Sequence, residues 1–167
     1  MHDPVVGQCT LRDAFTAAST GAADTDDVQI NIPASIGKIT LTDGPLAYNG
    51  GTGNFSLTVA GGGNTVDQTT SGARVITSTT SATLTVSGLT LTGGNVNPGV
   101  GGAIETDGNL AITNSTVTDN AATGNLADTL RVGPSRNNAL VLTNTTVSSN
   151  TATATGTNDE GGIVDSG

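Results

Sequence analysis

Between residues 82 and 150 the chain repeats one short pattern in which aliphatic and polar residues alternate. Three stretches align without gaps: ATLTVSGLTLTGG (82–94), GNLAITNSTVTDN (108–120) and NALVLTNTTVSSN (138–150). The alignment places Leu84, Leu110 and Leu140 in register, 26 and then 30 residues apart. A pattern that recurs every 20 to 50 residues or so indicates a solenoid.

Within each copy the alternation has the period of two that is typical of β-strands. In Thr83-Leu84-Thr85-Val86 the aliphatic side chains point to one side and the threonines to the other. Each copy therefore predicts two short strands joined by a bend at Gly88, Asn114 or Asn144. With a Gly-rich return, the two strands form one coil of a parallel β-helix, and successive coils stack at about 4.8 Å.

Equivalent residues of successive coils are expected to lie over one another in columns. Leu84, Leu110 and Leu140 form the first predicted core column. Asn114 and Asn144 are expected to form an amide ladder at an interior corner, beneath Gly88 in left-handed conformation. Further columns are expected at Val86, Ile112 and Leu142, at Leu91, Val117 and Val147, and at Gly94, Asn120 and Asn150. Weaker alternating patterns at 28–32, 39–42 and 55–59 predict earlier coils.

The beginning of the chain predicts a helix rather than a strand. Over residues 9–20, Leu11 and Phe15 lie on one helical face, Thr10 is the expected N-cap, and Asp13 occupies the capping-box position. An open solenoid end requires a cover for its core. We therefore expect this helix to cap the β-helix, with Leu11 and Phe15 as its plug.

The end of the chain carries no comparable pattern. Gly161-Gly162-Ile163-Val164 echoes Gly101-Gly102-Ala103-Ile104, so a new coil is expected to begin there. We expect residues 1–167 to form a single β-helix domain, with a cap at 9–20 and coils over 28–167. The chain is then a fragment of a longer array, or its last edge meets another molecule.

Composition excludes several functions. The formal net charge is −9, and aromatic residues make up 2% of the chain. A nucleic-acid partner requires a basic surface, so none is expected. Cys9 is the single cysteine, which excludes an internal disulfide, and no apolar run is long enough to span a bilayer.

The N-terminal stretch CTLRDAFTAAS resembles the CSLREA-type motif of bacterial surface and secreted proteins. The segments GGAI, VTDN, VSSN and GGIV resemble the GG-A-I and F-x-x-N repeats of polymorphic outer-membrane proteins and autotransporter passengers, with Val in place of Phe. The resemblance implies a right-handed parallel β-helix of pectate-lyase-like shape. It further implies a location outside the bacterial cell, on its surface or secreted, often with an adhesin-like role.

Catalytic chemistry on such a fold needs clustered carboxylates, bases and sugar-stacking aromatic rings. The acidic candidates are Asp24, Asp26 and Asp27 in one turn and Asp159 with Glu160 in another; the basic ones, Lys38, Arg74, Arg131 and Arg136, share no spacing; the aromatic ones are Phe15, Tyr48 and Phe55. We interpret the first acidic group as a solvated turn and expect no catalytic residue and no cofactor. The acidic loops could hold Ca²⁺ loosely, and His2 is not expected to be a ligand.

The predicted outer wall carries stacked T-x-T pairs: Thr90 with Thr92, Thr116 with Thr118, and Thr146 with Ser148. A flat threonine array resembles the ice-binding face of β-solenoid antifreeze proteins. The alternative is that threonine is simply a favourable outward residue in strands. The neighbouring face is irregular, because Thr85, Ala111 and Val141 share one column.

These observations favour a noncatalytic structural or adhesive module of the bacterial surface. Its expected partners are further copies of itself, joined end to end into fibres, or surface glycans. Two alternatives remain open: a carbohydrate-binding or polysaccharide-degrading β-helix, and an ice-binding solenoid.

Overall fold

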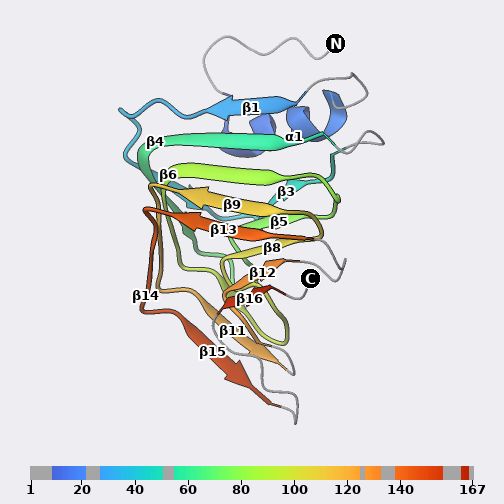
Figure 1. The fold of residues 1–167 in the computed structure, drawn as a ribbon. Helices are drawn as coiled ribbons and strands as arrows, with labels where there is room; N and C mark the ends of the chain where they lie inside the picture. Colours follow the sequence, from blue (N-terminus) through green and yellow to red (C-terminus); the bar gives the residue numbers. More distant parts are fainter. Residues whose placement is uncertain are drawn as a thin grey trace.

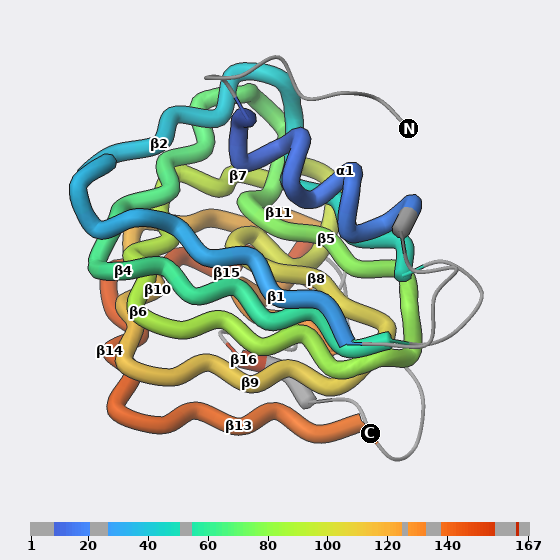
Figure 2. Tube along the Cα trace, turned by 90° about the horizontal axis from the view of Figure 1, so that it is seen from above, coloured from blue at the N-terminus to red at the C-terminus, as the bar shows by residue number. Residues whose placement is uncertain are grey.

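The chain folds as a parallel β-helix of about four turns with one short helix at its N-terminal end (Figure 1). The structure, a computed structural model, describes residues 9–21, 27–50, 55–124, 127–132, 138–155 and 163–165. Viewed from the N-terminal end, the chain turns clockwise as it recedes from the viewer, so the coil is right-handed (Figure 2). The fold class predicted from the repeats is confirmed.

Three parallel sheets form the walls of the coil. Sheet A bends at one corner. The strands before the bend are β1 (Val28–Asn31), β9 (Leu110–Thr113) and β13 (Leu140–Thr143), and the strands after it are β2 (Lys38–Leu41), β10 (Thr116–Thr118) and β14 (Thr146–Ser148). Two long strands, β4 (Leu57–Gln68) and β6 (Leu84–Thr92), continue through the bend. Sheet C holds β7 (Asn95–Val96), β11 (Ala121–Gly124) and β15 (Thr151–Ala154). Sheet B holds β3 (Leu46–Tyr48), β5 (Ile76–Ser78), β8 (Ile104–Thr106), β12 (Leu130–Val132) and β16 (Ile163–Asp165).

The core consists of aliphatic columns that run from coil to coil. Leu84 pairs in register with Leu110, and Leu110 pairs with Leu140, as the repeat alignment predicts. The column continues upward through Leu57 to Val28. Burying one such leucine side chain stabilises the fold by about 1.5–3 kcal/mol, so the columns supply much of the driving force for stacking.

The corner within sheet A has the left-handed backbone that the sequence predicts. Gly88, Asn114 and Asn144 have φ values of 61°, 50° and 47°. Glycine adopts this conformation without strain, and asparagine tolerates it better than most residues. Asp119 and Ser149, both at φ 55°, form a second left-handed corner five residues later in their coils.

Helix α1 (Leu11–Gly21) lies across the N-terminal end of the coil, against β3 and β1 (Figure 2). Its capping box is formed: the Thr10 backbone N–H donates to the Asp13 carboxylate (3.0 Å), and the Asp13 N–H donates to Thr10 Oγ1 (3.1 Å). Phe15 is 1% exposed within the core, whereas Leu11 is only half-buried. Arg12 anchors the helix by donating to the carbonyl of Pro45 (2.6 Å). The predicted helical cap is thus present, with Phe15 as its main plug.

The sequence similarity aligns Gly161-Gly162-Ile163-Val164 with Gly101-Gly102-Ala103-Ile104, but in the structure the two segments pair one residue out of that alignment. Ile163 pairs with Leu130, which pairs with Ile104. Ile163 therefore lies in the column of Ile104 rather than in that of Ala103, because strand register, and not the glycine pair, fixes the alignment. Within the described residues, no helix has the length and apolarity required to cross a membrane.

Candidate functional site

The threonine face comprises Thr90, Thr92, Thr116, Thr118, Thr146 and Ser148 on the outside of sheet A beyond the bend. Thr90 pairs with Thr116, and Thr116 with Thr146, so one column holds threonine in three successive coils. Thr118 pairs with Ser148 in the adjacent column. The structure thus brings the predicted T-x-T pairs together on one parallel sheet.

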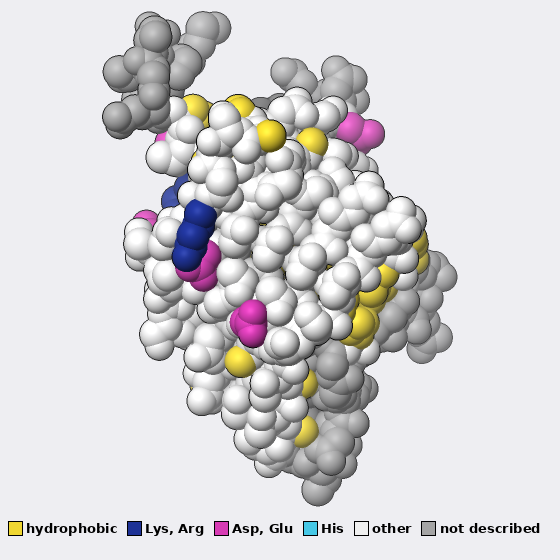
Figure 3. All heavy atoms as spheres, turned by 90° about the vertical axis from the view of Figure 1, so that its left-hand side faces the viewer, with side chains coloured by type: hydrophobic (Ala, Val, Ile, Leu, Met, Phe, Trp, Pro, Cys, Tyr) yellow, Lys and Arg dark blue, Asp and Glu magenta, His cyan; other side chains and the backbone are white. Residues whose placement is uncertain are grey.

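The threonine face is bounded toward the N-terminal end by an ion pair. Thr65 continues the first column above Thr90, while Asp67 stands above Thr92. Lys38, from the coil before, contacts Asp67 at 2.7 Å. Figure 3 looks onto this side of the molecule, where most side chains are uncharged and polar. The face is therefore a nearly neutral, hydroxyl-rich surface on an acidic protein.

The Asn114–Asn144 ladder exists, but it lies outside the coil. Asn144 Nδ2 donates to Asn114 Oδ1 at 3.3 Å, and both side chains are exposed. The prediction of an interior corner was therefore wrong, because the left-handed backbone at this bend turns the side chain toward solvent. The ladder connects two coils at the surface.

A second ladder, at the other corner, points into the coil: Asn120 is buried and Asn150 is half-buried. Asn150 Oδ1 accepts hydrogen bonds from the backbone N–H of Asn120 (3.0 Å) and from its side-chain amide (3.1 Å). Asn120 Oδ1 accepts the N–H of Gly94 in the coil above (2.9 Å), and its Nδ2 donates to the Leu91 carbonyl (3.1 Å). The repeat alignment places Gly94, Asn120 and Asn150 in one column, but only the structure shows that the side chains at this corner point into the coil.

Four charged residues meet on sheet B and the segments that lead into it. Arg74 forms an ion pair with Glu105, and Arg131 Nη1 lies 3.0 Å from Asp128 Oδ2. Glu105 and Arg131 are register partners in β8 and β12. The sequence shows no shared spacing for Arg74 and Arg131, because return segments of unequal length hide the proximity that the fold gives them.

Both carboxylates of this charged cluster are engaged by arginine. Asp128 is 0% exposed, and its Oδ1 accepts the N–H of Gly101 at 2.6 Å. Burial raises the pKa of Asp128 above 3.8 despite the hydrogen bonds from Gly101 and Arg131, and the nearby charge of Glu105 raises it further. A glycosidase mechanism requires two carboxyl groups that reach the substrate. Asp128 cannot reach one, so the cluster serves as a cross-coil link.

Two of the three aromatic rings lie in the interior, where they cannot stack on a sugar, and the third, Phe55, is half-buried. Phe15 and Tyr48 are buried, and the Tyr48 hydroxyl donates to the carbonyl of Phe55 at 2.8 Å. Desolvation, with the nearby charge of Asp27, raises the pKa of Tyr48 above 10.

The predicted acidic turn is described only at Asp27, whose Oδ1 accepts the N–H of Ser56 at 2.9 Å. The other candidates fall outside the described residues: Asp24, Asp26, Asp159, Glu160, Arg136 and His2. In the part of the chain that the structure describes, no three His, Cys, Asp or Glu side chains gather as metal ligands would.

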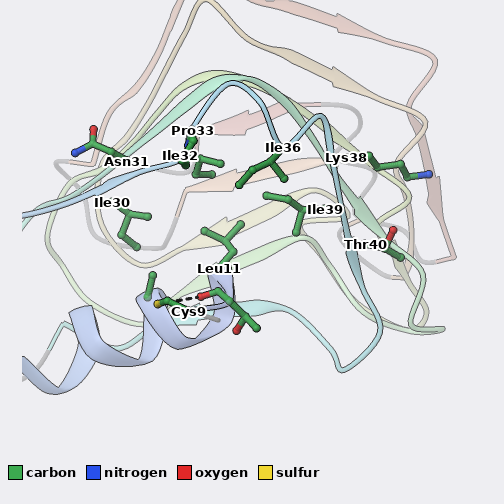
Figure 4. Close-up of a pocket in the computed structure, with 12 residues that line it drawn as sticks. Cys9, Leu11, Ile30, Asn31, Ile32, Pro33, Ile36, Lys38, Ile39 and Thr40 are labelled. Carbon is green, nitrogen blue, oxygen red and sulfur yellow. Dashed lines mark hydrogen bonds between the residues drawn. The ribbon is translucent and has the colours of Figure 1, made fainter. Parts of the chain in front are cut away.

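A pocket of about 580 Å³ opens beside the cap, between α1 and the first coil. Leu11, Ile30, Ile36 and Ile39 line it, and Cys9 lies at the start of the helix beside it (Figure 4). The helix packs on the first coil near β3 and β1. The pocket walls are mainly aliphatic because they are formed by residues of the first coil that the helix leaves uncovered. The cap is therefore incomplete over β2.

The last coil, residues 138–155 and 163–165, exposes the core columns at the opposite end. Leu142 is 37% and Ile163 41% exposed, while Ile112 and Leu130, one coil above, are both fully buried. Leu140 and Val147 are half-buried for the same reason. Each of these residues packs on the coil before it, and its other side faces outward.

Comparisons with protein-family models, curated proteins and solved structures find no match for this chain.

Proposed function

We propose that this chain is a noncatalytic structural module of an extracellular bacterial protein, with an adhesive or scaffolding role. The observation that carries the proposal is the continuous register of the coils. The column from Val28 through Leu57, Leu84 and Leu110 to Leu140 stays aliphatic in every coil. Such uniform stacking makes a stiff body whose outer walls are free to vary.

The disposition of the charged and aromatic side chains supports a noncatalytic role. Glu105 is held by Arg74 and Asp128 by Arg131, and both Phe15 and Tyr48 serve the interior. A carbohydrate-active site requires carboxylates and rings that face the substrate. The alternative of polysaccharide cleavage is tested by incubating the chain with pectins and other acidic polysaccharides, where release of unsaturated or reducing sugars would overturn the noncatalytic assignment.

An extracellular location is supported by the resemblance of residues 9–19 to the CSLREA-type motif and by a surface with few charges. The test uses intact cells of the source bacterium and an antibody raised against the chain. Labelling of unpermeabilised cells, and its loss after protease treatment of those cells, is the expected result. Labelling only after permeabilisation would refute the surface location.

A second function, ice binding, is favoured by the register of the threonine face. Thr90, Thr116 and Thr146 repeat at the spacing of the coils, and threonine methyl and hydroxyl groups on a flat sheet suit an ordered water layer. The test is thermal hysteresis and ice-crystal shaping by the purified chain. Thr116→Lys, which places a charge in the middle of the face, should abolish both effects, whereas Thr58→Lys, on the same sheet before the bend, should preserve them. Round, unshaped crystals with the unmodified chain would end this hypothesis.

A further inference from the structure

We propose that the side-chain amide of Asn114 is a glycosylation site, to which an enzyme attaches a sugar through an N-linked bond. The inference rests on the proposed extracellular role, because sugars of this kind belong to surface segments of secreted proteins. It adds to that role a covalent modification and names the residue that carries it.

The sequence contains three Asn-x-Ser/Thr triplets, the motif that N-glycosylating enzymes recognise. They are Asn54-Phe55-Ser56, Asn114-Ser115-Thr116 and Asn144-Thr145-Thr146. Asn54 lies outside the described residues. The other two asparagines lie in successive coils, at the left-handed bend within sheet A. Because a triplet is a short motif, its meaning depends on whether the fold presents the asparagine to an enzyme.

The two asparagine ladders differ in exposure and also in sequence. Asn114 and Asn144 are exposed, and each is followed two positions later by threonine. Asn120 and Asn150, which point into the coil, are each followed at that position by alanine. Within the repeat, the triplet therefore coincides with the asparagines that an enzyme can reach.

The atom that would bond to the sugar, Nδ2, is available in Asn114 but engaged in Asn144. Asn144 Nδ2 donates a hydrogen bond to Asn114 Oδ1 at 3.3 Å. Asn114 Nδ2 has no hydrogen-bond partner among the residues that the structure describes. Gly88 occupies the same corner one coil above, so no side chain stands over the Asn114 amide from that position. These contacts select Asn114 as the acceptor.

The residues that follow Asn114 keep the outer side of the triplet clear. Ser115 is buried, and its Oγ donates to the Thr113 carbonyl (2.8 Å) and accepts the Leu89 N–H (3.2 Å). Thr116 faces outward, in the first column of the threonine face. The two residues that define the triplet thus lie on the outside of the coil, while the middle residue is held inside.

The reaction uses a glycosyltransferase and a sugar activated as a phosphate or diphosphate ester at its anomeric carbon. Asn114 Nδ2 displaces the phosphate group: the anomeric C–O bond breaks, an N–C bond forms, and an amide proton passes to a base of the enzyme. A nucleotide sugar delivers a single sugar residue, whereas a lipid-linked donor delivers a preassembled glycan. The bond formed at Asn114 is the same in both cases.

A sugar at Asn114 bears on both functions proposed above. It is bulky and hydrophilic, and it stands two residues from Thr116, beside the threonine face. The core columns are untouched, because the amide lies outside the coil. The modification therefore suits a surface module and opposes flat contact between the threonine face and ice.

The experiment examines the protein made by the source bacterium, captured with the antibody used for cell-surface labelling. Trypsin cleaves at Arg131, so Asn114 and Asn144 fall in different peptides, whose masses and fragments are measured. We expect a sugar on Asn114, and the size of the mass increment distinguishes the two donors. The peptide that contains Asn144 should have the mass of its sequence. Unmodified masses for both peptides, or a sugar on Asn144 but not on Asn114, would overturn the inference.

Variants produced in the same bacterium test recognition of the triplet. Asn114→Gly should remove the sugar and keep the bend, because Gly88 forms this corner in the coil above. Thr116→Ala keeps the asparagine and should lower the modified fraction at least tenfold, whereas Thr116→Ser preserves the triplet and should retain the sugar. A sugar that survives Thr116→Ala would refute the inference.

The outcome is separable from that of the proposed function. Surface labelling of a chain that carries no sugar would overturn the glycosylation site and leave the extracellular location in place. A sugar on a chain that is labelled only after permeabilisation would do the reverse.

Discussion

Asn150 lies directly below Asn120, and its side-chain oxygen accepts both the backbone N–H (3.0 Å) and the side-chain amide (3.1 Å) of that residue. Asn120 is 1% exposed, and it repeats the same contact with Gly94 in the coil above. A buried polar side chain in a column of this kind is stabilising only while every partner is satisfied.

Replacing Asn120 with alanine should therefore be costly. The change leaves the Gly94 N–H and the Leu91 carbonyl without their partner, at about 1–3 kcal/mol for each buried group. We expect a loss of about 3 kcal/mol in the free energy of unfolding, measured by urea titration. Asn144→Gly is the matched control, because it removes an exposed ladder contact yet keeps the left-handed bend, and it should change stability by less than about 0.5 kcal/mol. Similar losses in both variants would contradict the distinction between the two ladders.

The leucine column offers a second comparison, at Leu110 and Leu140. Leu110 is fully buried between two coils, and its truncation to alanine should cost about 2–5 kcal/mol. Leu140→Ala should cost roughly half as much, since the leucine of the last coil is half-buried. Urea denaturation of both variants at a concentration where the chain is monomeric checks the ranking. The opposite ranking would mean that the last coil is more tightly packed than its exposure indicates.

The cap can be tested in the same way. Phe15→Ala removes the aromatic plug and should destabilise the chain by about 3–5 kcal/mol. Leu11→Ala, on the same helical face, should have a smaller effect, because Leu11 is half-buried beside the pocket. Thermal unfolding followed by far-UV circular dichroism gives both values. A larger loss for Leu11 would show that the helix seals the pocket more completely than the structure indicates.

The buried carboxyl of Asp128 predicts a pH dependence with a definite sign. Its pKa in the folded state is raised above 3.8, so between that value and the folded pKa the folded state binds more protons than the unfolded one. Stability from this group is therefore greatest at low pH and is lost as the pH rises through the folded pKa.

The measurement compares the unmodified chain with Asp128→Asn, whose side chain does not titrate. The free energy of unfolding of the unmodified chain, relative to that of the variant, should increase between pH 7 and pH 4. Urea titrations at pH 7, 5.5 and 4 give this difference directly. A decrease toward pH 4 would mean that the ion pair with Arg131 outweighs burial.

The sequence predicted the coils well because their determinants are local and repeated. Alternation around Leu84, Leu110 and Leu140 specifies strands, and Gly88 with Asn114 marks a bend that needs left-handed backbone. The capping box of Thr10 and Asp13 is equally local. These features depend on residues only a few positions apart, so the local sequence is enough to predict them.

Contacts that depend on the segments connecting the sheets within a coil could not be predicted from the sequence in the same way. Arg74 and Glu105 are brought together by connecting segments of different length, so no regular spacing in the sequence predicts their ion pair. The inward direction of Asn120, against the outward direction of Asn114, depends on which corner the coil encloses. The shift that places Ile163 below Leu130 likewise follows from strand pairing.

The side chains of Asn120 and Asn150 both reach back to the preceding coil, so each coil is completed by residues that come later in the chain. As the polypeptide is synthesised, the helix and the first strands emerge before the segments that finish them. The corner groups of a coil therefore stay unsatisfied until the next coil is in place, and this dependence couples the folding of neighbouring coils. A defect in one coil accordingly weakens the coils that adjoin it.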